Sequence, residues 1–178
     1  MKTFVALLRG INVGRAKRVA MSDLRKLAEG LGFEGVRTVL NSGNVLFRAR
    51  IAAGTAAQRM EKALVAELGV SSRIIVLSAK ELGDIIETNP IPAATAEPSR
   101  FLIAVVREPG DLERIRSLAA QDWGAEKLAL GERAAYMWCP SGILESRIVE
   151  ATGRALGDSA TTRNWATINR LYLLIGEG

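Results

Sequence analysis

The same order of predicted elements occurs twice along this chain of 178 residues. In each half, hydrophobic periodicity predicts an apolar strand, a helix, a strand hairpin, a second helix and a closing strand, and one more helix follows. The β-α-β-β-α-β order is that of the ferredoxin-like split unit. The sequence therefore predicts an α+β protein of two ferredoxin-like halves, each followed by a helix. One mixed sheet with helices on both sides is the alternative, and the repetition favours the duplicated fold.

Capping residues and glycines mark the elements of the first half. Ser22 is predicted as the N-cap of a helix that Gly32 ends. Two capping boxes, Thr55–Gln58 and Ser78–Glu81, predict the starts of two more helices. The predicted strands cover residues 3–8, 36–40, 45–47 and 73–77, and the tight turn 41–44 joins the second strand to the third.

Pro90, Pro92 and Pro98 lie among small residues where the first half ends. This composition predicts a linker over residues 90–99, between an N-terminal domain (1–89) and a C-terminal domain (100–178). In the second domain we expect strands at 100–106, 127–130, 134–139 and 159–162, helices with Asp111 and Ser141 as N-caps, and a last helix that contains Ile168 and Leu171.

The first strand of each half is apolar without polar alternation, over residues 4–8 and 101–106. A strand in an antiparallel sheet with one face in water should alternate apolar and polar residues. Both faces of these strands therefore need cover. The helix after each unit, the other half of the chain, or the partner in a homodimer are the three candidates.

The composition excludes several common chemistries. The chain has no histidine and one cysteine, which excludes Ser-His-Asp triads, His-ligated or thiolate zinc sites and iron–sulfur clusters. Neither the phosphate-loop nor the dinucleotide glycine fingerprint is present. We therefore expect no metal and no cofactor, and the sequence leaves open whether the protein is an enzyme. The single cysteine, Cys139, is predicted to be a buried small hydrophobe rather than a reactive thiol.

The apolar runs of the chain are short. The N-terminal run stops at Arg9, too early for the core of a signal peptide, and no run reaches the length of about 18 apolar residues that a membrane span needs. We expect a cytoplasmic protein without membrane contact.

Positive charge is concentrated near the N-terminus. The net charge is +5, but residues 1–50 hold ten Lys/Arg and three Asp/Glu, a balance of +7. A basic surface attracts anionic partners. Its strongest concentration is the segment 9–18, which combines four cationic side chains, two glycines and Asn12 just before a predicted helix. Glycines allow the backbone to approach a ligand closely, and a helix N-terminus favours an anion.

Topology predicts neighbours for this basic loop. In a ferredoxin-like sheet the third strand runs antiparallel beside the first, so the end of the first strand should lie beside the turn 42–44, with the start of the fourth strand at the same edge. The predicted ligand-binding residues at this edge are Arg9, Gly10, Asn12, Gly14, Lys17, Arg18, Ser42, Gly43, Asn44 and Arg73.

The loop, the turn and the C-terminal region together resemble a known family. The residues 7–14 (LLRGINVG), Met21 with 23–25 (DLR), 31–33 (LGF), 42–45 (SGNV) and 162–165 (TRNW) are similar to those of the bacterial family named domain of unknown function 1697. The resemblance spans nearly the whole chain and implies no assigned activity. This chain has Arg15 where members usually have a second glycine. Among the motif residues, Arg163 and Asn164 are expected to cap and anchor the last helix.

Four functions remain open on the sequence alone. The leading hypothesis is a binding protein for a small anionic or nucleotide-like ligand. The alternatives are a weak nucleic-acid binder, whose affinity would fall steeply with salt, an enzyme that works without histidine, and a structural or interaction protein that forms a homodimer.

Overall fold

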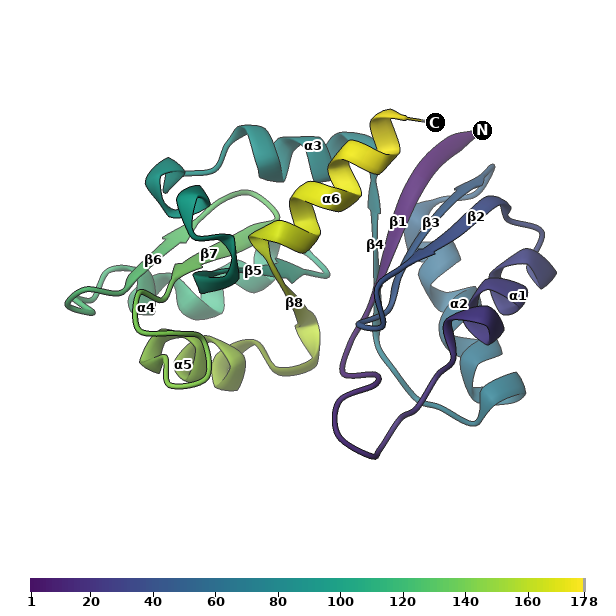
Figure 1. The fold of residues 1–178 in the computed structure, drawn as a ribbon, viewed down its shortest axis with the longest axis horizontal. Helices are drawn as coiled ribbons and strands as arrows, with labels where there is room; N and C mark the ends of the chain where they lie inside the picture. Colours follow the sequence, from purple (N-terminus) through teal and green to yellow (C-terminus); the bar gives the residue numbers. More distant parts are fainter. Residues whose placement is uncertain (178) are drawn as a thin grey trace. The chain divides into compact units, whose positions relative to one another are not determined.

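The computed structural model describes residues 1–177, which divide into two compact units (Figure 1). The first unit comprises Met1–Leu82 and the residues from Leu173 on, and the second comprises Gly83–Tyr172. Both divisions fall inside helices, α3 (Ala79–Glu87) and α6 (Trp165–Gly176). The predicted linker 90–99 lies inside the second unit, where it forms the short 3-10 helices η1 (Pro92–Ala96) and η2 (Pro98–Arg100).

The first unit has one antiparallel sheet with the strand order β2-β3-β1-β4. Its sequence of elements is the ferredoxin-like one, and two helices pack on one sheet face. The elements are β1 (Lys2–Leu8), α1 (Met21–Gly30), β2 (Glu34–Val39), β3 (Asn44–Ala49), α2 (Ala53–Leu68) and β4 (Ile74–Ser78).

Alternate residues of the central strands build the core of this unit. Phe4, Ala6 and Leu8 of β1 are buried against the two helices, beside Phe47 of β3. Phe47 also stacks on Phe33, with the ring centroids 4.5 Å apart. We call this the helix face of the sheet. The residues between them, such as Val5 and Leu7, point to the second face and are buried as well. Because both faces of β1 are buried, its residues do not alternate between apolar and polar.

The second unit repeats this topology with the strand order β6-β7-β5-β8. A 3-10 helix and a short α-helix replace the first helix of the motif. The elements are β5 (Phe101–Val106), η3 (Pro109–Ile115), α4 (Arg116–Ala119), β6 (Lys127–Leu130), β7 (Ala134–Trp138), α5 (Arg147–Leu156), η4 (Gly157–Ser159) and β8 (Ala160–Asn164). The two ferredoxin-like halves predicted from the sequence are confirmed.

Residues of α3 and α6 cover the second face of this sheet. Trp165, the first residue of α6, stacks on Phe101 of β5 with the ring centroids 5.3 Å apart. The Tyr136 hydroxyl of β7 donates a hydrogen bond of 2.7 Å to the carbonyl of Ile85 in α3. The expectation that a helix covers the apolar first strand is confirmed in this unit. A second subunit as further cover stays a prediction.

Three of the predicted helix starts are wrong. The helices α1 and α2 begin after Ala20 and Ala52, rather than at Ser22 and Thr55, so no side-chain cap opens them. The helix α5 begins after Ser146, whose hydroxyl accepts a hydrogen bond from the amide of Val149, and not near Ser141. The physical reason is that a cap forms only where the chain turns into the helix, and Ser22 and Thr55 already lie inside the first turns of α1 and α2.

Two other predicted caps lie closer to the observed ones. The Ser78–Glu81 box is confirmed, because the Ser78 amide donates to the Glu81 carboxylate and the Glu81 amide donates to the Ser78 hydroxyl. Asp111 is not an N-cap. It is the third residue of η3 and accepts a hydrogen bond from the amide of Glu108, which is the N-cap.

Within the described residues, no helix has the length and apolar character that a membrane crossing requires. The same part of the chain holds no group of three Asp, Glu or Cys side chains placed to bind a metal ion.

Candidate functional site

The structure brings the predicted basic edge together. The term basic edge refers here to three segments: the β1–α1 loop (9–19), the β2–β3 turn (40–44) and Arg73, which directly precedes β4. The Leu8 amide donates to the Gly43 carbonyl, and the Arg9 amide donates to the Arg73 carbonyl, both at 2.9 Å. The predicted adjacency of these three segments is therefore confirmed. The ligand-binding role of their side chains stays a prediction.

Asn12 clamps the basic loop to the turn. Its side-chain Nδ2 donates to the carbonyls of Val19 at 2.9 Å and Asn41 at 2.8 Å, and its Oδ1 accepts from the Val19 amide at 2.8 Å. Its backbone amide donates to the Lys17 carbonyl at 3.0 Å. Both N–H groups of the amide are thus in use within the protein. Asn12 fixes the loop, and it has no N–H group left for a ligand.

Gly43 and Asn44 of the turn also have structural roles. Gly43 has φ +88°, and a Cβ atom there would lie 2.7 Å from Cδ1 of Ile11 and 2.9 Å from Cβ of Leu8. Asn44 is completely buried, and its Nδ2 donates to the Val39 carbonyl and the Ser42 hydroxyl at 2.7 and 2.9 Å. These contacts account for three of the predicted ligand-binding residues, Ser42 included, without a ligand.

The cationic side chains of the basic edge differ in their surroundings. Arg73 lies 3.9 Å from the Glu61 carboxylate, which partly offsets its charge. Lys17 and Arg18 are exposed, and among residues 1–177 neither forms an ion pair. Gly10 and Gly14 have φ values of +65° and +64°, so they are needed for the course of the loop. Binding of an anion or of nucleic acid by this loop stays a prediction.

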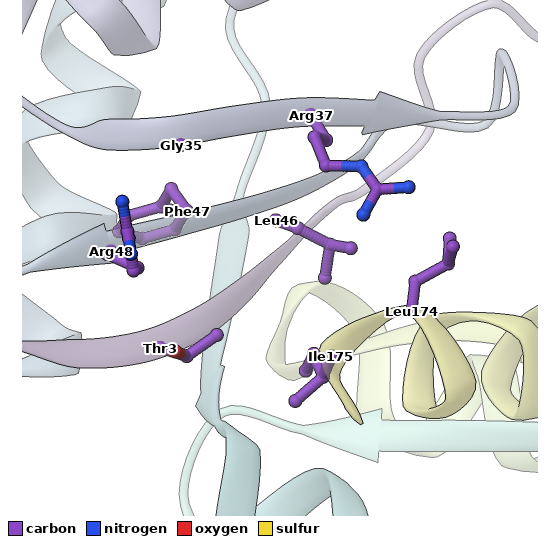
Figure 2. A pocket seen from close by; sticks show the side chains of 8 residues that line it. All are labelled: Thr3, Gly35, Arg37, Leu46, Phe47, Arg48, Leu174 and Ile175. Carbon is purple, nitrogen blue, oxygen red and sulfur yellow. The ribbon is translucent and has the colours of Figure 1, made fainter. Parts of the chain in front are cut away.

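A pocket that the sequence did not predict lies on the second face of the first unit's sheet (Figure 2). Its volume is about 240 Å³. Leu46, whose exposed fraction is 4%, lies on its floor, and the last turn of α6 forms a wall. Figure 2 shows the Arg37 side chain extending toward Leu46 and Leu174, with Arg48 on the other side of Leu46. The lining residues are Thr3, Gly35, Arg37, Leu46, Phe47, Arg48, Leu174 and Ile175.

A β-bulge places Arg37 on this face. Glu34 pairs with Arg48, and Arg37 pairs with Leu46, so two residues of β2 stand opposite the single Phe47. In a regular ladder Arg37 would pair with Val45, which belongs to the helix-face core. Since opposed residues of an antiparallel pair point to the same face, the extra residue turns Arg37 toward the pocket.

Gly35 makes the bulge possible and leaves room for Arg48. Its φ is +60°, a backbone conformation that residues with a side chain adopt at a cost. A Cβ atom at this position would lie 3.3 Å from Nε of Arg48. The glycine therefore lets the Arg48 side chain lie close against the β2 backbone. A lone glycine in a strand is the one signal in the sequence that indicates such a bulge.

The chemistry of the pocket is that of a binding site. Among the described residues that line it, the ionisable groups are two guanidinium groups, and no carboxylate, thiol or amine lies with them. Arginine stays protonated at ordinary pH, so it cannot act there as a general acid or base. Among residues 1–177 the guanidinium groups of Arg37 and Arg48 form no hydrogen bond and no ion pair. The arrangement can hold an anion, with apolar contact below it.

The C-terminal motif residues anchor α6. The Asn164 side chain accepts a hydrogen bond of 2.9 Å from the Thr167 amide, so it caps the helix as predicted. Arg163 is 6% exposed, and its Nη1 donates to the Thr161 hydroxyl and the Thr162 carbonyl. Burial lowers the pKa of Arg163 to about 10, so it remains charged at neutral pH. These hydrogen bonds satisfy donors of the buried guanidinium group and so offset part of the cost of burying its charge.

Cys139 is buried, as the sequence predicted, and burial raises the pKa of its thiol. Both properties oppose reaction, because the thiolate is the reactive form and the reagent needs access. We expect Ellman's reagent to modify native Cys139 at pH 8 at least about 100-fold more slowly than the urea-unfolded chain. Equal rates in the two states would show that the thiol is accessible in the folded protein.

Comparison with known proteins identifies relatives without assigning an activity. The family described as Protein of unknown function (DUF1697) matches residues 1–136, which include the basic loop, the turn and β2 but not the motif at 162–165. No curated protein sequence matches the chain. The structure of the conserved bacterial protein SP0830 from Streptococcus pneumoniae is similar over 97% of both chains, with a TM-score of 0.77 and 21% identity. At this identity the likeness concerns the fold.

Proposed function

The chain belongs to the family of proteins of unknown function DUF1697, and we propose that it is a binding protein for a small anionic ligand. The pocket between Arg37 and Arg48 is the proposed site. The observation that carries this proposal is a pair of guanidinium groups, without a protein partner among the described residues, on either side of the buried side chain of Leu46. The predicted class of function is kept, and its site moves from the basic loop to this pocket.

Other arginines of the chain support this choice by contrast. Arg25, Arg100, Arg116 and Arg154 each lie within 3.5 Å of a carboxylate three or four residues away. Such pairs are exposed and local, and they leave little charge for a ligand. The guanidinium groups of the two pocket arginines have no such carboxylate partner among the described residues, and apolar side chains line the pocket beside them.

The experiment compares two sets of variants against one panel of anions. Inorganic phosphate, AMP, acetate and hexanoate are tested by thermal shift and by calorimetric titration of the full chain. We expect at least one of them to raise the melting temperature of the wild type by about 2 °C or more at saturation. The double variant Arg37→Gln, Arg48→Gln is expected to lose this shift.

Two control variants locate the site. Arg50→Gln removes an exposed arginine just beyond β3 and outside the pocket, and we expect it to respond like the wild type. The triple variant Arg9→Ala, Lys17→Ala, Arg18→Ala removes charge from the basic edge and should also keep the shift. Loss of the shift in this triple variant alone would place the ligand at the basic edge. An absence of any shift in the wild type would contradict the proposed function.

A further inference from the structure

From the lining of the pocket we infer that its ligand is a small carboxylic acid with an apolar body. This inference rests on the proposed function and names the class of ligand for the same site. It follows from three properties of the pocket, namely its two cations, its apolar surface and its size.

The cationic part fits a carboxylate. A guanidinium group presents a planar fork of N–H donors that matches the two oxygens of a carboxylate. Arg37 and Arg48 are separated by one position along the sheet, because Arg37 pairs with Leu46 and Arg48 is two residues further along β3. They approach the pocket from two neighbouring strands (Figure 2). Arg37 reaches toward Leu46, so it is the cation that a carboxylate over Leu46 would contact, and Arg48, beside Gly35, adds positive charge at the far side of the pocket.

The apolar part excludes ligands that are polar throughout. Leu46, Leu174 and Ile175 offer no hydrogen bonds, and apart from the arginines Thr3 is the lining residue with a polar side chain. The hydroxyl groups of a sugar would lose water there without finding partners, which is unfavourable. A hydrocarbon chain gains from the same contact, since each methylene that leaves water strengthens binding. We therefore expect the pocket to bind nucleotides and sugar phosphates more weakly than an acid with a hydrocarbon chain.

The size of the pocket suits a small ligand. The volume of about 240 Å³ is smaller than the roughly 300–1,000 Å³ typical of pockets for drug-sized molecules. A short aliphatic acid fits such a volume. Charge, apolar surface and volume agree on one class of ligand.

Calorimetric titration of the full chain with a homologous series tests the inference. The probes are acetate, butyrate and hexanoate, with hexanamide as a neutral molecule of nearly the same shape. We expect hexanoate to bind at least tenfold more tightly than acetate, because its methylenes contact the apolar lining. Hexanamide should bind at least tenfold more weakly than hexanoate, because the guanidinium groups have lost the charged partner.

Variants assign these effects to the pocket. Arg37→Gln changes an exposed residue, so we expect the fold to be kept and the affinity for hexanoate to fall at least tenfold. Leu46→Thr replaces the apolar floor and should reduce the preference for hexanoate over acetate. Arg50→Gln serves as the matched arginine outside the pocket and should bind hexanoate like the wild type.

The outcomes separate this inference from the proposed function. Equal affinity for acetate and hexanoate, equal affinity for hexanoate and hexanamide, or tighter binding of AMP than of hexanoate would each overturn the carboxylate assignment. If AMP or phosphate then still required Arg37, the proposed anion-binding function would stand. If no anion required Arg37, both would fail.

Discussion

Replacement of Gly43 by alanine is expected to lower the free energy of unfolding by about 2–5 kcal/mol. The left-handed backbone at φ +88° costs a residue with a Cβ atom roughly 1–2 kcal/mol. The new methyl group would also overlap Ile11 and Leu8, two buried residues 2.7 and 2.9 Å away, and such overpacking costs about 1–3 kcal/mol. Urea denaturation followed by far-UV circular dichroism measures the loss.

Gly14→Ala is the matched control for this prediction. Gly14 has a φ of +64°, in the same left-handed region, but among the described residues a Cβ atom there would meet nothing within 4 Å. It carries the backbone cost of roughly 1–2 kcal/mol alone. Equal destabilisation by the two variants would show that the close approach of the turn to β1 does not matter.

The second large effect is expected for Asn12→Ala, with a loss of about 2–4 kcal/mol. The substitution removes three hydrogen bonds and leaves the amide of Val19 and the carbonyl of Asn41 without their side-chain partner. Each such bond contributes about 1 kcal/mol, and a buried amide without a partner costs more. The loop should open locally before the unit unfolds as a whole.

Limited trypsin digestion measures that local opening. The loop contains Arg15, Lys17 and Arg18, which are cleavage positions for this protease. Cleavage follows the open population when opening is fast, so we expect it to be at least about tenfold faster in Asn12→Ala than in the wild type. Asn41→Ala is the control, because Asn41 accepts the bond through its backbone carbonyl and should be cleaved like the wild type. Cleavage of Asn12→Ala at the wild-type rate would contradict the clamp.

Sequence patterns predicted much of this fold because the determining signals are local. The apolar runs of β1 and β5 and the Ser78–Glu81 capping box each arise within a few residues. The wrong predictions concern the first residues of single helices. Nothing near Ser22 or Ser141 shows where the chain turns into its helix, since that point depends on packing against the sheet.

In the candidate sites, too, some features follow from the order of elements and others depend on contacts between distant residues. The order of elements was enough to place the β2–β3 turn beside the end of β1, and the hydrogen bond from the Leu8 amide to the Gly43 carbonyl agrees with this placement. The role of Asn12 was not visible, because its side chain finds one of its partners 29 residues away. The sequence indicated a charged loop, and the structure shows a loop that its own asparagine holds in place.

The repeat of elements, which by itself determined the two ferredoxin-like units, rests on hydrophobic period and chain order. The direction in which a single side chain points is not set by hydrophobic period and chain order. Arg37 points to the pocket because one extra residue at Gly35 shifts the register of β2 against β3, and a shift of one residue turns every following side chain to the other face. Pairing register is decided between strands, so only the tertiary structure could bring Arg37, Leu46 and Arg48 together.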